Sequence, residues 1–263
     1  MTIQLLFLIP LFAVAHGVIK EIDTQIVGKR FAQPGEVPYQ VSLQLIRTGE
    51  HFCDGVLVDR YYILTAAHCV DGVNVSTISA NMGLIDLQRP HAVHQIESSY
   101  IHEDYNKDGQ WINDIALLKL QFPINYSPLV SPVTLTLNQN IPVDTEVVAS
   151  GFGRLWYQGE EPTRLYVADI KIVNQGYCRN VYAKTFKNIY DTQICANDAT
   201  AEKRSCMRPY FGGPITLNNE LIGLDSWGYE CGSKIFPEVY TRVPSYIPWI
   251  VDGTEHVKIC FDT

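Results

Sequence analysis

Short apolar or β-branched runs alternate with polar turn segments over most of the chain. Glycine, proline, asparagine and aspartate separate the runs, and no α/β alternation or long amphipathic helix interrupts them before the end. This pattern predicts an all-β fold made of barrels or sandwiches. The clearest runs are residues 40–46, 56–58, 115–120, 146–149 and 221–226. The one late helix candidate is residues 245–257, where Pro248 and Gly253 limit its extent.

Composition narrows the classes of partner. The 263 residues are 46% hydrophobic and 18% charged, which is enough apolar material for one sizeable core or two fused half-domains. The formal net charge of −8 leaves no basic face for phosphate backbones or anionic lipid. We therefore expect no nucleic acid partner and no membrane partner.

The N-terminus predicts export from the cell. An apolar run at residues 5–15 ends in the small-x-small sequence AVA, which indicates a signal peptide at residues 1–15 with a second cleavage option after Gly17. The run is too short for a membrane helix, which needs about 18 apolar residues. We expect a secreted, extracellular protein in which residues 16–25 form a short pro-like segment.

The cysteines indicate disulfides and not zinc, because the chain has no C-x-x-C pair and follows a signal peptide. Their number is odd, so one is left over. Two N-glycosylation sequons begin at Asn74 and Asn125, the second weakened by Pro128, and the sequence leaves their occupancy open. The seven cysteines are Cys53, Cys69, Cys178, Cys195, Cys206, Cys231 and Cys260.

Eight short motifs follow one another along the chain. They are IVG (26–28), PYQVSL (38–43), LTAAHC (64–69), DIALL (114–118), GFG (151–153), GGP (212–214), SWG (226–228) and VYTRV (239–243). Their order is that of the chymotrypsin/trypsin family, which the chain resembles over nearly its whole mature length. One such motif is weak, but eight in order are specific. The resemblance implies two six-stranded antiparallel β-barrels packed at right angles, a catalytic cleft between them and a C-terminal helix.

The same resemblance divides the chain. It implies a trypsin-like domain at residues 26–258, with a first barrel at about 26–125, a second at about 133–244 and a helix at about 245–257. The proline-containing segment 122–132 would cross between the two halves.

The resemblance also assigns roles to single residues. It makes His68 the general base and Asp114 the carboxylate that orients it. Without a nucleophile, the two would instead serve as a buried hydrogen-bonded pair that supports the barrel interface. The implied disulfides are Cys53–Cys69, Cys178–Cys195 and Cys206–Cys231. Cys260 has no counterpart and is either free or bridges two chains, with a monomer as the default expectation.

The loop that should carry the serine departs from the family. Active relatives have Cys-x-Gly-Asp-Ser-Gly-Gly-Pro, whereas this chain has CMRPYFGGP, which is one residue longer. Aligned on the glycines, Phe211 replaces the serine, Tyr210 the aspartate and Pro209 the glycine whose amide helps to form the oxyanion hole. Aligned on Cys206, Tyr210 takes the serine position.

These replacements predict an inactive site. Phenylalanine has no nucleophilic atom, and a tyrosine phenol with a pKa of about 10 is unsuited to serine-type acyl chemistry. Proline has no amide hydrogen, and the loss of one oxyanion donor costs about 3–4 kcal/mol. Activation is also altered, because Gln25 precedes Ile26, Lys29 replaces a family glycine and no aspartate follows Cys206. We therefore expect no functional cleavage before Ile26.

The primary specificity pocket is altered as well. By resemblance its base residue is Arg204 and its far wall carries Glu238, beside the wall residues Ser226, Trp227 and Gly228. Arg204 either pairs with Glu238 across the pocket or points to solvent. In both cases a long side chain stands where a substrate side chain would enter.

No metal or cofactor is expected. His91 and His94 lie in a β region, where side chains at this spacing tend to face opposite sides. The family's calcium loop needs paired carboxylates, and residues 75–97 offer only Asp86 and Glu97.

A narrower resemblance concerns function. Phe52-Cys53 and the PYQVSL run are similar to mite group 3 allergens, and the altered serine loop most closely resembles the scabies mite inactivated protease paralogues. That group implies secretion into the mite gut, release into host skin and interference with host complement. We therefore expect an inactive secreted binding protein whose partners are complement or other plasma defence proteins. The alternatives are a residual or unusual hydrolase and an inert allergen-like secreted protein.

Overall fold

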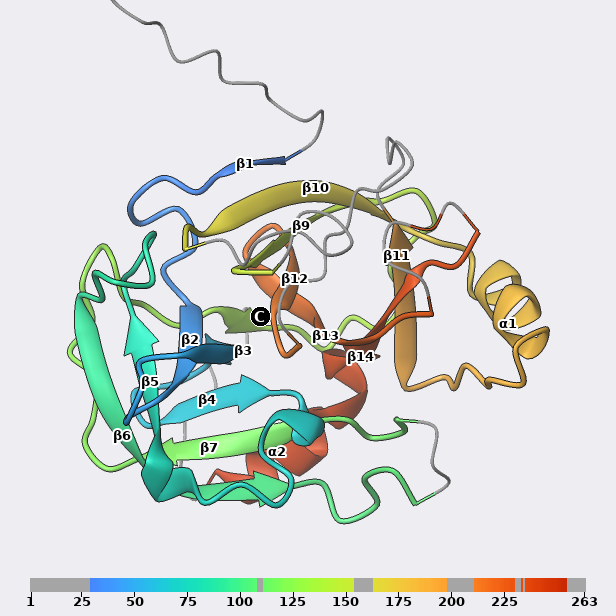
Figure 1. Ribbon diagram of the computed structural model, residues 1–263. Helices are drawn as coiled ribbons and strands as arrows, with labels where there is room; N and C mark the ends of the chain where they lie inside the picture. Colours follow the sequence, from blue (N-terminus) through green and yellow to red (C-terminus); the bar gives the residue numbers. More distant parts are fainter. Residues whose placement is uncertain are drawn as a thin grey trace, which may run out of the picture.

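Two β units lie side by side in the computed structural model, the first drawn in blue to green and the second in yellow to red (Figure 1). The structure describes residues 29–107, 111–153, 163–197, 211–229, 233 and 235–254. The predicted signal peptide, the pro-like segment and the activation residues Gln25 and Ile26 lie outside the described residues.

The first unit is a closed six-stranded barrel with the order β2-β3-β4-β7-β6-β5. Its inward side chains are buried aliphatic residues, and this burial drives its closure. Strand β6 is half exposed along its length, with an alternating pattern that suits a strand facing water on one side. The strands are β2 (Gln40–Leu45), β3 (His51–Leu57), β4 (Tyr62–Thr65), β5 (Ile78–Met82), β6 (Ala92–Ile101) and β7 (Ala116–Leu120).

The second unit closes into a ring through strand β9, which pairs with a strand on each side. Six strands form the ring β9-β10-β11-β14-β13-β12, because β9 pairs with both β10 and β12. The predicted fold of two six-stranded barrels is therefore confirmed. A short strand, β8 (Thr134–Leu135), adds to β13 in parallel. The ring strands are β9 (Glu146–Gly151), β10 (Tyr166–Ile172), β11 (Gln193–Asn197), β12 (Pro214–Leu217), β13 (Glu220–Trp227) and β14 (Glu238–Arg242).

Strand β1 (Lys29–Phe31) joins the second sheet, although the first barrel was predicted to begin at about residue 26. It pairs with β10, with Phe31 opposite Tyr166. The rings of Phe31 and Tyr166 lie 4.6 Å apart, and the Arg164 guanidinium covers the Phe31 ring at 3.6 Å. The aromatic contact and the cation–π contact thus hold the start of the domain on the second barrel.

One α-helix lies against the second barrel, and the C-terminal helix lies against the first. Helix α1 (Gln175–Ala183) was not predicted, and its N-cap is the Asn174 side chain, which accepts from the Tyr177 amide at 2.9 Å. The C-terminal helix was predicted at residues 245–257. The structure has a 3₁₀ turn, η3 (Val243–Tyr246), followed by α2 (Ile247–Gly253), while residues 255–257 lie outside the described part. Pro248 in the first turn fits a helix that starts there.

Polar contacts join the barrels where the site lies. The Ser150 hydroxyl of β9 donates to Gln40 Oε1 of β2 at 2.7 Å, and the Tyr39 and Thr216 hydroxyl oxygens lie 3.1 Å apart. All four residues are buried or nearly so, which makes the interface a continuation of the core. None of the helices in the described part of the chain is long and apolar enough to cross a membrane.

Candidate functional site

Two short segments of the first barrel present the histidine and the carboxylate. His68 lies in a 3₁₀ turn, η1 (Ala67–Cys69), directly after β4, and Asp114 lies just before β7. Strands β4 and β7 pair with Thr65 opposite Ala116, so their ends bring the two side chains together. The residue before the carboxylate, Asn113, has a left-handed backbone with φ of 53°.

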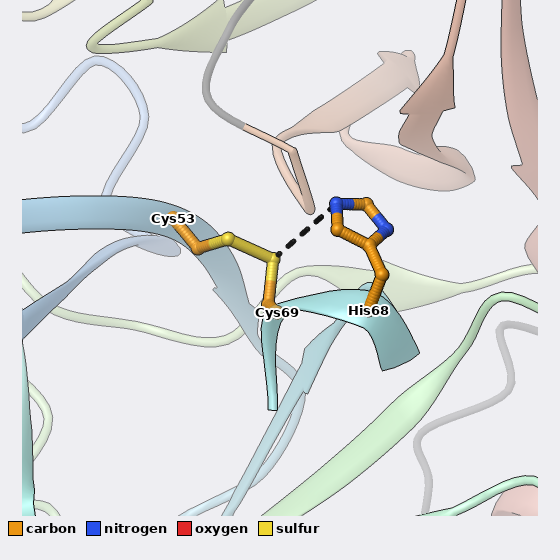
Figure 2. A group of neighbouring side chains, drawn as sticks. All are labelled: Cys53, His68 and Cys69. Atoms are coloured by element: carbon orange, nitrogen blue, oxygen red, sulfur yellow. Dashed lines mark hydrogen bonds between the residues drawn. A yellow bond between two sulfur atoms is a disulfide. The ribbon is translucent and has the colours of Figure 1, made fainter. Parts of the chain in front are cut away.

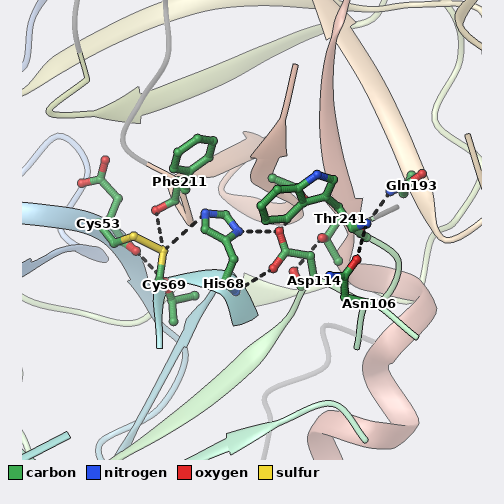
Figure 3. Close-up of polar contacts among 12 residues, drawn as sticks. Cys53, His68, Cys69, Asn106, Asp114, Gln193, Phe211 and Thr241 are labelled. Carbon is green, nitrogen blue, oxygen red and sulfur yellow. Dashed lines mark hydrogen bonds and ion pairs between the residues drawn. A yellow bond between two sulfur atoms is a disulfide. The ribbon is translucent and has the colours of Figure 1, made fainter. Parts of the chain in front are cut away.

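The histidine and the carboxylate form a hydrogen-bonded pair (Figure 3). His68 Nδ1 lies 2.7 Å from Asp114 Oδ2, and the His68 backbone amide donates to Asp114 Oδ1 at 3.0 Å. The Asp114 side chain is fully buried, whereas 13% of the His68 side chain is exposed. This is the geometry in which a carboxylate fixes the orientation and tautomer of an imidazole.

Strands of the second barrel complete the surroundings of the carboxylate. The Ser226 hydroxyl in β13 donates to Asp114 Oδ2 at 2.5 Å, and the Thr241 hydroxyl in β14 donates to the Asp114 carbonyl at 2.8 Å. The sequence placed Ser226 in the specificity pocket. The structure shows in addition that its side chain holds Asp114, which the motif alone did not reveal.

The other imidazole nitrogen faces a disulfide and an aromatic ring. His68 Nε2 lies 3.9 Å from Cys69 Sγ, and that sulfur is bonded to Cys53 (Figure 2). The Phe211 ring stands edge-on to the imidazole, with the ring centroids 4.5 Å apart. Within the described residues no hydroxyl forms a hydrogen bond with Nε2. The described atoms around Nε2 therefore supply no group for it to activate.

The backbone around Phe211 is fixed by both barrels. The Asp54 amide of β3 donates to the Phe211 carbonyl at 3.0 Å. On the other side the Gly212 amide donates to the Asp225 carbonyl and the Asp225 amide to the Gly213 carbonyl, each at 2.8 Å. Gly212 has φ of 90°, and a Cβ there would overlap the Asp54 carbonyl and the Thr65 side chain, so only glycine fits.

A second aromatic ring lies close to the histidine. The Trp111 ring centroid is 5.2 Å from that of His68, again edge-on. Its backbone is held at both ends, since its amide donates to Asn106 Oδ1 at 2.9 Å and its carbonyl accepts from Gln193 Nε2 at 3.3 Å. The imidazole thus contacts two aromatic rings edge-on, those of Trp111 and Phe211.

The Glu238 side chain lies against Gly228, which the resemblance assigns to the wall of the specificity pocket. A Cβ on Gly228 would overlap the Glu238 carboxylate, so the carboxylate lies directly against that wall. Burial, followed by the charges of Asp225 and Glu238, raises the pKa of Tyr240 well above its usual value. The neighbouring wall residue Trp227 is 7% exposed and packs edge-on against Tyr182 at 4.8 Å. The Glu238 carboxylate therefore lies beside Gly228, on the wall that the resemblance assigns to the specificity pocket.

Several predicted site residues lie outside the described residues. The structure therefore gives no geometry for the Arg204–Glu238 pair, for the oxyanion position or for the third disulfide. The residues are Arg204, Cys206, Pro209, Tyr210, Cys231 and Cys260. Two of the three implied disulfides are present among the described residues, Cys53–Cys69 and Cys178–Cys195.

Sequence reasoning missed a buried acid next to the site. Asp54 is fully buried, accepts from Gln40 Nε2 at 2.8 Å and from the Phe152 amide at 3.3 Å, and has its pKa raised well above the usual range by desolvation. It lies at the barrel interface beside the Phe211 backbone. Its position directly after Cys53 was the one available hint in the sequence.

The cysteine sulfurs beside His68 are not available as metal ligands. Cys53, His68 and Cys69 have ligand atoms within 4.8 Å of one another, but both sulfurs belong to a disulfide and neither is a thiolate. Glu97 of the calcium-loop region pairs with Lys119 at 3.3 Å, and Asp86 Oδ1 accepts from the Gln88 amide.

Both glycosylation sequons lie on the surface. Asn74 and Asn125 are exposed. The Asn74 side-chain oxygen accepts from the Ser76 amide at 3.1 Å and caps a 3₁₀ turn, η2 (Val75–Thr77). The hydrogen bonds of the Asn74 side chain to Ser76 use its oxygen, and the residue as a whole is exposed, so the cap is compatible with a glycan.

The family model described as Trypsin matches residues 26–250, which include both barrels and the His68–Asp114 pair. The chain belongs to the trypsin family. It is 37% identical over 227 residues to Chymotrypsin-2 of Vespa crabro, covering 86% of this chain and 98% of that protein. It is 31% identical over 238 residues to Trypsin epsilon of Drosophila erecta, covering 90% of each.

A solved trypsin-family structure has the same architecture. Neuropsin, a serine protease from mouse brain, matches with a TM-score of 0.75 and 30% identity, covering 86% of this chain and 99% of that chain. The departures at Phe211 and Glu238 therefore lie within the part of the chain that the family model matches.

Proposed function

We propose that this trypsin-family chain is a catalytically inactive, secreted protein that acts by binding other proteins. The observation that carries the proposal is the environment of His68 Nε2, which faces the Cys69 sulfur at 3.9 Å and the Phe211 ring at 4.5 Å between centroids. Acyl transfer needs a hydroxyl or thiolate within about 2.6–3.2 Å of the base.

The pocket adds independent support. Proteases of this family select substrates by a side chain that enters the pocket, and here the Glu238 carboxylate lies against Gly228. A ligand side chain entering this space would have to displace a charged group. Loss of substrate entry and loss of a nucleophile both favour a role without turnover.

The finer part of the proposal concerns the partner. The resemblance to the scabies mite inactivated protease paralogues, through the Phe52-Cys53 pair and the altered serine loop, supports interference with host complement or another plasma defence protein. Secretion, with the gut lumen as a first destination, follows from the same resemblance and from the apolar run at residues 5–15.

Two measurements on the secreted protein test this function. Labelling with a fluorophosphonate, with active trypsin as the control, should remain at background. Complement-mediated lysis in diluted serum should fall when the protein is added. Stoichiometric labelling would instead favour the residual hydrolase, for which the intact His68–Asp114–Ser226 hydrogen bonds are the supporting observation. Absence of both activities would favour an inert secreted protein.

A further inference from the structure

The loop after α1 carries an exposed phenylalanine at its tip. Phe186 is 93% exposed, more than any other large hydrophobic side chain in the described part of the chain. Helix α1 lies at the far right of Figure 1, on the side of the second barrel that faces away from the first. We call residues 184–187 the Phe186 tip.

Hydrogen bonds fix the backbone of the tip. The Tyr182 carbonyl accepts from the Thr185 amide at 2.9 Å, the Thr185 hydroxyl at 2.8 Å and the Lys187 amide at 3.2 Å. The Phe186 amide donates to the Ala183 carbonyl at 3.2 Å, and Phe186 has φ of 60°. A left-handed backbone at an aromatic residue is unfavourable by itself and persists only when its surroundings impose it.

The residues on both sides of the Phe186 tip are anchored to the second barrel. The Tyr182 ring is fully buried, and its hydroxyl donates to the Pro237 carbonyl at 2.6 Å. Helix α1 is tied to β11 by the Cys178–Cys195 disulfide, and Arg179 Nε donates to the Ile189 carbonyl at 3.1 Å beyond the tip. Both ends of the loop are anchored, so little conformational entropy is left to lose on binding.

Two lysines flank the phenylalanine. Lys184 is exposed and Lys187 is half-buried, and neither forms an ion pair with any residue that the structure describes. The chain as a whole carries a formal net charge of −8, so this local positive charge stands against the overall sign. Such a patch favours a partner surface that is negative where the tip docks.

We infer that the Phe186 tip is a protein-docking site that inserts the Phe186 ring into an apolar pocket rimmed by carboxylates on the partner. The inference rests on the proposed binding function and names its contact surface. Rigid aromatic anchors with matched charges at the rim are the usual centres of protein interfaces. A membrane is the weaker occupant, because one phenylalanine and two lysines give little anchoring to a protein of net negative charge.

Photo-cross-linking of the full secreted chain tests the site. The photoreactive residue p-benzoylphenylalanine is placed at position 186 and, as a control, at position 122, where Phe122 is 71% exposed in a distant segment. In diluted plasma, position 186 should give a discrete cross-linked band that position 122 does not give. Excess wild-type protein should abolish this band. No band at position 186, or the same band at both positions, would overturn the inference.

Competition by variants sharpens the result. Phe186→Ser should compete about 30-fold less well than wild type. Lys184→Glu with Lys187→Glu should compete about 10-fold less well, whereas the exposed control Arg47→Glu should compete as wild type does. Equal competition by Phe186→Ser, with unchanged circular dichroism, would sink the proposal. If wild type lowers complement lysis and Phe186→Ser lowers it equally, this inference fails while the proposed function stands.

Co-sedimentation with vesicles containing phosphatidylserine tests whether the Phe186 tip binds a membrane. We expect the protein not to co-sediment with them. Co-sedimentation that is lost in Phe186→Ser would assign the tip to a membrane and overturn the protein-docking inference.

Discussion

The two parts of the site differ in burial and in how closely they follow the family. Around Asp114, three hydrogen bonds converge from His68 and Ser226 on a fully buried carboxylate, and this arrangement matches the family's hydrogen-bonded pair. Around Phe211 and Glu238 the side chains border the cleft, and there the chain departs from the family. Polar groups that are buried together stabilise the fold whether or not catalysis occurs, whereas a nucleophile at the cleft surface serves only the chemistry.

The largest expected loss of stability comes from removing the buried Asp114 carboxylate. Asp114→Ala leaves the His68 amide, His68 Nδ1 and the Ser226 hydroxyl without their acceptor, and it should lower the free energy of unfolding by about 3 kcal/mol. Urea unfolding followed by tryptophan fluorescence measures this loss. Asp114→Asn keeps one acceptor oxygen and should lose less. A loss below about 1 kcal/mol for the alanine variant would show that the pair has no structural role.

Substitutions at Gly228 and Glu238 should have coupled effects on stability. Gly228→Ala places a Cβ against the Glu238 carboxylate and should destabilise the protein by about 1–3 kcal/mol. In a Glu238→Ala background the same change should cost clearly less, and a double-mutant cycle gives the coupling between the two sites. Equal costs in both backgrounds would mean that the carboxylate does not lie against this wall in solution.

Asp54 predicts a smaller, pH-dependent effect. Desolvation raises its pKa in the folded protein, so the folded state holds this proton more tightly than the unfolded chain. The stability that Asp54 contributes is therefore full at low pH and is lost as the pH rises through the raised pKa. Relative to Asp54→Asn, the wild type should lose stability on the order of 1 kcal/mol as the pH rises from about 5 to about 8, because only the wild type can ionise at this position. A stability difference between the two proteins that does not depend on pH would contradict the raised pKa of Asp54.

The smallest effect is expected from the most obvious repair. Phe211→Ser restores a hydroxyl near His68, but labelling by a fluorophosphonate and hydrolysis of peptide esters should both stay at background. The serine loop is one residue longer than in active relatives, Pro209 lacks an amide hydrogen and Glu238 borders the pocket. Catalytic groups act as a unit, so one repair recovers little of the lost rate. Clear turnover by this variant would show that the loop is still built for catalysis.

The β architecture could be predicted because its runs are apolar and end at turn residues. The run at residues 40–46 corresponds to β2, and the run at residues 221–226 lies inside β13. Helix α1 was missed because it is only nine residues long, has Gly176 in its first turn and is recognisable mainly by its Asn174 cap. The pairing of β1 with β10 was not predicted, because pairing between distant segments leaves no local pattern.

The sequence predicted which residues lie in the site, but not their hydrogen-bond partners or their burial. Motif order identified His68 and Asp114, since their spacing from neighbouring motifs is specific. It did not indicate that Ser226 bonds to Asp114, or that Asp54 is fully buried. The burial of a carboxylate depends on packing between strands far apart in sequence, which neither periodicity nor composition reports.

The disulfide beside the imidazole has a consequence for redox chemistry. Reduction of the Cys53–Cys69 bond would leave a thiol on Cys69, 3.9 Å from His68 Nε2. The reactive form of cysteine is the thiolate. Reducing agents would therefore place a free cysteine beside His68 in a protein whose oxidised form has the sulfur in a disulfide. Electrophilic probes distinguish the oxidised protein from this reduced species only in buffers free of thiols.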